Sequence, residues 1–572
     1  MQNPPPQPLP TPILPLKLPN HLPLLPSKNP PHPYLPQALF SFSPPPPFHP
    51  PSTPILFPPL HTPLLKSTSI PPGVDEIWGE EYKREEEEGG GRFVCVGRGG
   101  IRFLGLGVAG SINGLLAEYA KPLDKEFHSP RDAHGHGTHT LSTAAGSFVA
   151  NISCKGLGLG TIRGGAPNVR LAIYKVCWNV LGGKCSTADM LKAFDEAIHD
   201  GVDVLSLSLV NYVPLFSDVD ERDGIATGSF HAVAKGITVM CATGNNGSSA
   251  HYPCNEDFPC IEVDYGIGTR ILFISGLPRY PLVKLSPPKM IVGKPLSAKV
   301  AYFSYRGPNS ITPTSLKPNI AAPSVNILAA TSPLYSFTEG GYAMMSGTSM
   351  STSHVTGIVA LIKRMHPNWS SAAIKSAIVT TAWRNGPSGL PIFAEGSPQK
   401  LANSFDFGGG LVNPNGAAEP GLVYDMGAAD YMEYLCAREH NNSAISRLIG
   451  KITTCPVKKP FILDVNLPSV TIPSPRNPIT VKRTVTNVGA PESIYKATIE
   501  PPFGTIVYVN PTALAFNSTV EKLTFTITIS AIHEMNTGYY FGSLTWVDGV
   551  HAVRISLSVK TEFLQPHDDD ED

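Results

Sequence analysis

Strands and helices are predicted to alternate from residue 186 onwards, and this alternation constrains the fold more than any other feature of the sequence. Residues 186–189 (STAD) match a helix capping box, and the apolar residues that follow lie on one helical face until Gly201 ends the helix. A short apolar strand is expected at 202–209, a second helix at 223–235 and a second strand at 237–242. Strands and helices that alternate at this spacing form a parallel sheet with helices on both faces. The sequence therefore predicts an α/β fold.

The C-terminal part of the chain has a different sequence pattern, because short alternating runs rich in Thr, Val and Ile replace the helical periodicity. Turn residues separate these runs, and no stretch with a helical period intervenes. Such runs are typical of the strands of a small antiparallel sandwich. We therefore predict a β-sandwich over residues 465–562, with strands at Val470, Ile479–Val485, Tyr495–Ile499, Leu523–Ile529 and Val553–Val559.

The remaining segments are predicted to lie outside these two domains. Residues 1–75 hold nearly half of the 59 prolines. Because proline lacks a backbone donor and fixes φ, this stretch is expected to be an extended, disordered tail. Residues 76–128, with the charge run EEYKREEEEGGGR, are expected to be a degenerate linker or a remnant of the α/β domain. Residues 563–572 form an acidic tail, and the α/β domain itself is assigned to residues 129–460.

The composition argues against several classes of function. The net charge of -1 provides no general attraction to nucleic acid or to anionic membranes. No run of about 20 apolar residues is present, so no membrane span is expected, and no signal peptide is visible. The 9 cysteines contain no CxxC pair, which argues against a zinc ribbon. Their odd number leaves at least one free thiol in a monomer, and their spacing does not determine how they pair.

Three glycine-flanked polar clusters carry the candidate chemistry: RDAHGHGTHT at 131–140, CATGNNG at 241–247 and SGTSMSTSH at 346–354. Ser349 is predicted in the first turn of a helix, where unpaired N–H groups and the positive end of the helix dipole gather. A serine in that place can attack a carbonyl, and its own N–H can help to hold the resulting oxyanion. His136 is the candidate base for this serine, and the amide of Asn245 is the candidate second oxyanion donor.

In this order the three clusters resemble the histidine, asparagine and serine blocks of the subtilases. The flanking sequences STAAGS, GGAPNVRLAIYKVCW and KVAYFSYRGPN resemble plant members of that family. The resemblance implies a subtilisin-like parallel sheet with helices on both faces, followed by a C-terminal fibronectin-III-like β-sandwich. It also implies a serine endopeptidase that hydrolyses polypeptides through an acyl-enzyme, without a cofactor. An extracellular location, in the apoplast or cell wall, follows from the same resemblance.

The resemblance assigns a role to each candidate site residue. It implies that Ser349 is the nucleophile, His136 the general base and Asn245 the oxyanion donor. The substrate backbone is expected to pair with a short strand segment made of Ser206, Leu207 and Ser208.

The sequence also departs from the subtilase pattern. Members of the family carry a triad aspartate in a D-[ST]-G turn ahead of the histidine block, and no such turn occurs between Met1 and His136, so the triad aspartate is unassigned. Because this carboxylate orients the imidazole and stabilises the imidazolium, its absence predicts impaired catalysis. The protease-associated insertion is predicted to be largely missing near residues 248–285, together with a nearby core strand. The alternative function is a catalytically inactive pseudoprotease that binds peptides or proteins.

A metal-dependent alternative rests on His134, His136 and His139, whose spacing is similar to that of an HxHxDH metallohydrolase motif. Zinc would need further ligands and a carboxylate that orients them. Thr138 stands where that motif has its aspartate, and no second cluster follows, so no metal site is expected. His354, in the serine cluster, is expected to be a packed helix residue. The sequence leaves the oligomeric state open.

Overall fold

A computed structural model describes residues 94–97, 127, 130–178, 184–210, 223–247, 273, 297–335, 338–396, 399–438, 440–473, 478–532 and 537–561. The proline-rich tail, the acidic tail and most of the segments predicted at 76–128 and 248–285 lie outside these ranges. The chain divides into two compact units, and apart from Phe273 all residues described below belong to the unit formed by 71–269 and 288–572. No helix in the described ranges is long and apolar enough to cross a membrane.

The centre of the α/β domain is a sheet of four strands in the order β4 (Arg170–Ile173), β1 (Val94–Gly97), β7 (Val204–Leu207) and β8 (Thr238–Cys241). β7 and β8 are parallel, whereas β1 runs antiparallel to both β4 and β7. β4, β7 and β8 therefore point in one direction, as the alternation of strands and helices predicts. β1, which lies in the segment predicted to be a linker or remnant, enters the sheet in the opposite direction.

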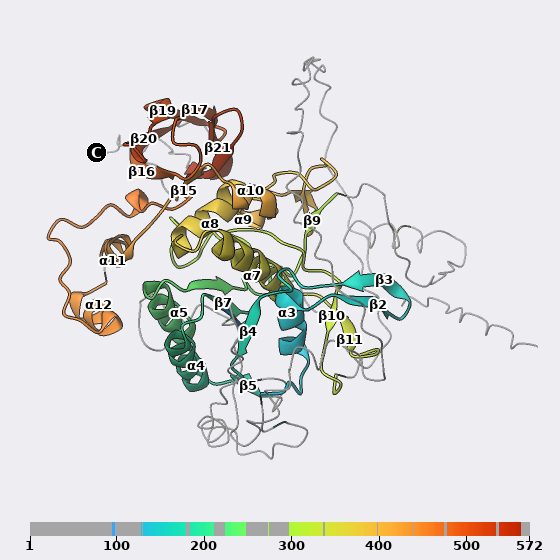
Figure 1. Ribbon diagram of the computed structural model, residues 1–572. Coiled ribbons are helices and arrows are strands. Elements are labelled where there is room, and N and C mark those ends of the chain that lie inside the picture. The colour runs from blue at the N-terminus through green and yellow to red at the C-terminus, as the bar shows by residue number, and fades with distance from the viewer. Residues whose placement is uncertain are drawn as a thin grey trace, which may run out of the picture. The chain divides into compact units, whose positions relative to one another are not determined.

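Helices cover both faces of this sheet (Figure 1). α4 (Thr187–Asp200) and α5 (Gly224–Ala234) pack on one face, in a core that includes Leu205. α3 (His136–Ala145), α7 (Thr348–Met365) and α8 (Ser371–Thr380) pack on the other face, in a core that includes Val204. Because successive strand residues point to opposite faces, Val204 packs into one core and Leu205 into the other. The predicted α/β arrangement is confirmed.

α4 begins where the sequence predicts, but the predicted capping box does not form. Ser186 is the N-cap residue, yet its side chain makes no capping hydrogen bond. The carboxylate of Asp189 accepts a hydrogen bond from Nε1 of the buried Trp178 (3.3 Å). The indole N–H thus engages the side chain that a capping box would use.

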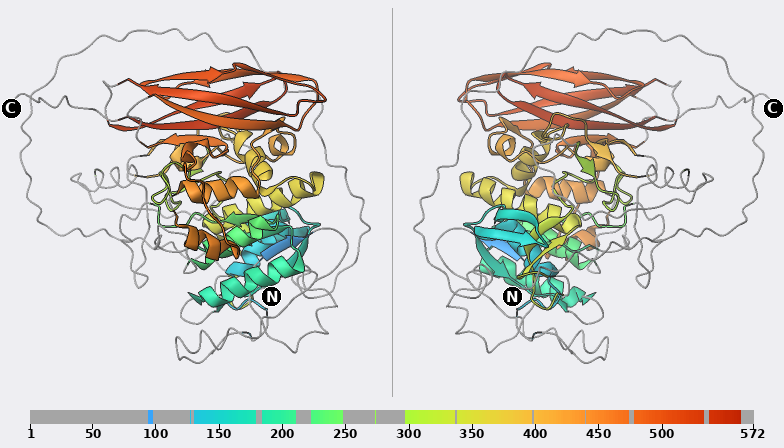
Figure 2. Two further views of the ribbon diagram at one scale, coloured as in Figure 1. Left: turned by 90° about the vertical axis from the view of Figure 1, so that its left-hand side faces the viewer. Right: turned by 90° about the vertical axis from the view of Figure 1, so that its right-hand side faces the viewer.

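The C-terminal domain is a sandwich of two sheets (Figure 2). The first sheet has the order β14 (Leu422–Val423), β16 (Ile479–Asn487), β20 (Lys522–Ala531) and β18 (Thr505–Asn510). The second has the order β15 (Ser469–Ile472), β22 (Ala552–Thr561), β21 (Gly538–Val547), β17 (Ser493–Glu500) and β19 (Ala513–Phe516). Trp546, Phe525 and Leu544 are fully buried between the sheets. The predicted β-sandwich is confirmed, and β14 joins it from the α/β side of the chain.

The other described elements are short. They are β2 (Val149–Cys154), β3 (Leu157–Ile162), β5 (Cys177–Trp178), β6 (Lys184–Cys185), β9 (Lys299–Val300), β10 (Ile327–Ala330), β11 (Tyr342–Met345), β12 (Phe393–Ala394), β13 (Lys400–Leu401), α9 (Ser404–Phe407), α10 (Pro414–Ala418), α11 (Ala428–Ala437), α12 (Asn442–Ile449) and a 3-10 turn (Ile462–Asp464).

Two disulfides resolve part of the cysteine pairing that the sequence leaves open. Cys177 pairs with Cys185 across β5 and β6, and Cys436 at the end of α11 pairs with Cys455. Among the described cysteines, Cys154 and Cys241 are free.

Candidate active site

Ser349 lies in the first turn of α7, as predicted, and is buried. Its carbonyl oxygen accepts hydrogen bonds from the hydroxyls of Ser208 (3.1 Å) and Ser353 (2.9 Å). Its own N–H has no acceptor among the described residues, which is usual for the first turn of a helix. The site therefore offers one backbone donor next to a hydroxyl nucleophile.

Asn245 is held against the residue that precedes the nucleophile. Its Oδ1 accepts from the N–H of Thr348 (2.9 Å) and from the hydroxyl of Thr348 (3.0 Å). Because a backbone N–H can only donate, the bonded atom must be the amide oxygen. The amide nitrogen is then left free to donate to a group beside Ser349. Contact between the asparagine and serine clusters is therefore direct, although 103 residues separate Asn245 from Thr348.

Thr348 was not singled out by sequence reasoning, although it is the residue that fixes Asn245. Besides donating to Asn245, its hydroxyl accepts from the N–H of Gly244 (3.2 Å). A hydroxyl beside the predicted nucleophile was the available signal. From the sequence alone this threonine cannot be distinguished from an ordinary helix N-cap, because threonine is also favoured as an N-cap residue.

His136 is the first residue of α3, at the end of a turn that Asp132 stabilises. The carboxylate of Asp132 accepts from the backbone N–H groups of His134, Gly135 and Thr138, at 3.1, 3.0 and 2.7 Å. Asp132 thus satisfies one unpaired N–H group in the first turn of the helix, that of Thr138, and two in the turn that precedes it. Gly135 has φ 98°, where a side chain is disfavoured.

α3 and α7 lie against each other, which places the histidine cluster beside the serine helix (Figure 1). Gly357 permits the close approach, because a Cβ at this position would lie 2.8 Å from the carbonyl oxygen of Ala144. Within the described part of the chain, however, no hydrogen bond links the ring of His136 to Ser349 or to any carboxylate.

Burial keeps the imidazole of His136 neutral. Loss of water around the ring lowers its pKa from 6.5 to about 4, and the negative charge of Asp132 opposes this shift only in part. The neighbouring His134 and His139 lower the pKa further. His136 is therefore a free base at neutral pH, but one that takes up a proton weakly.

The other two histidines of interest have structural partners. Nε2 of His139 lies 2.9 Å from the carbonyl oxygen of Ile327 and 3.2 Å from that of Ala343, so it carries the proton and joins α3 to β10 and β11. Nδ1 of His354 lies 2.9 Å from the carbonyl oxygen of Met350 within α7. Burial lowers the pKa of both rings. Among the described residues, no three His, Cys, Asp or Glu side chains are grouped to hold a metal ion.

The predicted substrate strand lies mostly inside the domain. The hydroxyl of Ser206 accepts from Thr356 of α7 (2.9 Å), and Leu207 is buried in the core below α4 and α5. Ser208 alone of the three reaches the first turn of α7, through its bond to the carbonyl oxygen of Ser349.

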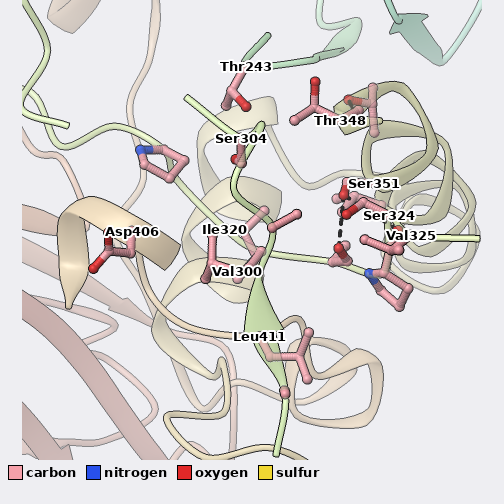
Figure 3. A pocket seen from close by; sticks show the side chains of 18 of the residues that line it. Thr243, Val300, Ser304, Ile320, Ser324, Val325, Thr348, Ser351, Asp406 and Leu411 are labelled. Atoms are coloured by element: carbon pink, nitrogen blue, oxygen red, sulfur yellow. Dashed lines mark hydrogen bonds between the residues drawn. The ribbon is translucent and has the colours of Figure 1, made fainter. Parts of the chain in front are cut away.

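A pocket of about 410 Å³ lies beside the same turn (Figure 3). Thr348 and Ser351 line it, and the hydroxyl of Ser351 donates to the carbonyl oxygen of Ala322 (2.8 Å). Ser349 is not among its lining residues. The pocket therefore adjoins the first turn of α7 without reaching the nucleophile.

Comparisons with known proteins agree with this geometry. Residues 117–410 match the subtilase family, and residues 464–559 match a fibronectin type-III domain. The chain is 44% identical to the subtilisin-like proteases SBT3.3 and SBT3.4 of Arabidopsis thaliana, over 81% of this chain and 76% of each relative. It is 46% identical to the subtilisin-like protease SBT3.13 of the same plant, over 81% of this chain and 73% of the relative.

The first of these alignments extends over 590 residues although it takes in only 81% of this 572-residue chain, so the relative holds residues within the matched span that this chain lacks. The family match covers more than half of the chain, and several relatives of high identity are named as subtilisin-like proteases. The chain therefore belongs to the subtilase family of serine endopeptidases, which act on polypeptides, and carries a C-terminal fibronectin type-III domain.

Proposed function

We propose that this chain hydrolyses peptide bonds through an acyl-enzyme on Ser349, with His136 as general base and Asn245 as oxyanion donor. The observation that carries this proposal is the pair of bonds from Thr348 to Oδ1 of Asn245. These bonds orient the amide before substrate arrives, and preorganised donors are the largest source of rate enhancement in acyl transfer.

In the proposed reaction, neutral His136 takes the proton of the Ser349 hydroxyl as Oγ attacks the scissile carbonyl. The resulting oxyanion accepts from the N–H of Ser349 and from Nδ2 of Asn245. The imidazolium then gives its proton to the leaving amine, and a water molecule hydrolyses the ester by the same route.

No carboxylate among the described residues bonds the ring of His136, and the sequence offers no recognisable triad aspartate, so we expect a slow protease. An aspartate in contact with the imidazole raises its basicity and stabilises the imidazolium. In subtilisin, loss of the triad aspartate lowers kcat by about 3 × 10⁴, which is about 6 kcal/mol of barrier. We expect a penalty of similar size for this chain.

The proposed place of action is the extracellular space, in the apoplast or cell wall. The plant relatives and the two disulfides at Cys177–Cys185 and Cys436–Cys455 support this, because disulfides persist in oxidising compartments.

A second candidate function is a pseudoprotease that binds peptides without cleaving them. The observation that favours it is the ring of His136, which has no hydrogen-bond partner among the described residues and a pKa lowered to about 4. Such a protein would keep the oxyanion donors but fail to activate the nucleophile.

Labelling with a fluorophosphonate probe tests the proposal. In folded protein the hydrolase labels on Ser349, and the label disappears in Ser349→Ala. Ser351→Ala, on the same helix, serves as the matched control and keeps the label. Folded protein that takes up no label in hours, while a peptide still binds, refutes the hydrolase and supports the pseudoprotease.

A further inference from the structure

β8 is the outermost strand of the central sheet, because β7 is its only partner among the described strands. The N–H groups of Thr238 and Ala242 donate to carbonyl oxygens along and just before β7, at 3.1 and 3.0 Å. Backbone groups alternate in direction along a strand, so those of Val239 and Cys241 point away from β7. No described strand pairs with them. An unpaired row of N–H and C=O groups is a template for a further strand.

Two pockets adjoin along this open edge, one of about 410 Å³ and one of about 650 Å³. Both are lined by Met240 and Cys241 of β8 and, on the facing wall, by Pro318 and Ile320. Figure 3 shows the smaller pocket with Ile320 on its wall. We call the space between β8 and residues 317–320 the β8 groove.

The larger pocket combines apolar walls with two lysines. Ile374 and Tyr431 contribute apolar surface, while Lys375 of α8 and Lys317 line the same space. Lys375 has no hydrogen bond or ion pair to any described residue, and Lys317 donates to Oδ1 of Asn319 (2.9 Å). Burial and the charge of Lys317 lower the pKa of Lys375 to about 7.

No aspartate or glutamate lines this pocket among the described residues. Two lysines that line one pocket without a carboxylate beside them make that pocket complementary to an anion. A ligand that met only the lysines would leave the backbone of Val239 and Cys241 unpaired. An extended peptide with an acidic side chain satisfies both requirements.

We propose that the β8 groove binds an extended acidic segment of another protein. The segment adds as a strand to the edge of β8 and places a carboxylate against Lys375 and Lys317. Ser349, His136 and Asn245 line neither pocket, although Thr348 lines the smaller one, so the groove borders the active site without including its reacting groups. Recognition of this kind takes affinity from main-chain hydrogen bonds and specificity from the side-chain pockets.

Fluorescence anisotropy with the full chain carrying Ser349→Ala, which prevents cleavage, tests the proposal. The probe is a blocked, labelled pentapeptide that alternates valine and glutamate, and the matched probe alternates valine and lysine. We expect the acidic peptide to bind about tenfold or more tightly than the basic one. A version of the acidic peptide methylated on alternate backbone nitrogens is expected to lose binding, because a methylated nitrogen cannot donate to β8.

Variants locate the binding in the groove. Lys375→Met is expected to lower the affinity for the acidic peptide about tenfold, since a charge-assisted hydrogen bond is lost. Lys235→Met, which removes an exposed lysine at the end of α5, leaves binding unchanged. Bound peptide is expected to protect the free thiol of Cys241 from alkylation. If Lys375→Met does not fold, Lys317→Met replaces it.

The proposal is overturned if the acidic and basic peptides bind equally, or if methylation of the peptide has no effect. It is also overturned if no peptide binds and Cys241 reacts at the same rate with and without it, which is the result expected when the groove is filled by the chain itself.

Discussion

The low pKa of His136 predicts an unusual pH dependence for reaction at Ser349. Only the neutral imidazole can accept the serine proton, so the rate of fluorophosphonate labelling follows the fraction of neutral His136. With a pKa of about 4, that fraction is nearly complete from about pH 5 upwards. The labelling rate should therefore be flat across the range in which most histidine-dependent hydrolases lose activity.

The size of the effect follows from the titration. With a pKa of about 4, the labelling rate falls only about 1.1-fold between about pH 6.5 and about pH 5, whereas an ordinary histidine with a pKa of about 6.5 gives a fall of about 16-fold. The assay is the time course of label incorporation at each pH, with circular dichroism at the same pH to confirm the fold. His136→Ala is the control, and it should lower the rate and remove the remaining pH dependence.

A fall of tenfold or more over this range, in protein that stays folded, would refute the reasoning. It would mean that a carboxylate or water reaches the ring of His136 and restores its basicity. The proposed penalty for the missing triad aspartate would then be wrong as well.

Four further predictions concern single residues. Asn245→Ala should lower the labelling rate of Ser349 by about 10²-fold or more, measured beside wild type, because one of two oxyanion donors is lost. Gly357→Val should lower the free energy of unfolding by about 1–3 kcal/mol in urea titrations, since its Cβ would meet Ala144 at 2.8 Å. Arg483→Met should lower it by more than about 3 kcal/mol, because the buried guanidinium donates to four backbone carbonyls; an unchanged midpoint would contradict this. Because the pKa of His136 is lower in the folded state, acidification from about pH 6.5 to about pH 4 should remove about 3 kcal/mol of stability that His136→Gln does not lose.

Much of the fold could be predicted because its signals are local. The apolar periodicity that ends at Gly201 gives the helix α4, and the alternation in Ile479–Val485 gives the strand β16. The direction of β1 could not be predicted, because a four-residue apolar run carries no information about which way it enters a sheet. β18 and β21 are not predicted because partly exposed residues interrupt their alternation. β19 does alternate, but it is only 4 residues long, which is too short for a clear pattern.

The candidate site shows the same division. The glycine-flanked clusters identify His136, Asn245 and Ser349, because turns and helix starts leave a compositional trace. Which atoms face each other depends on packing between distant segments. The hydrogen bond from Thr348 to Asn245 is one case. The hydrogen bond from the indole of Trp178 to Asp189, which was predicted to cap a helix, is another. Neither partner lies close enough in sequence to be read as a motif.

The strand β14 has a consequence for how the protein comes apart. Leu422 and Val423 pair with Asn487 and Thr486 of the sandwich, so the edge of one domain is supplied by the chain of the other. The guanidinium of Arg554 crosses in the reverse direction and donates to the carbonyl oxygen of Gly409. Cutting the chain between the two domains would remove β14 from its sheet or leave the buried carbonyl oxygen of Gly409 without its donor. The two should therefore melt in a single transition, and the loss of either one should bring down the other.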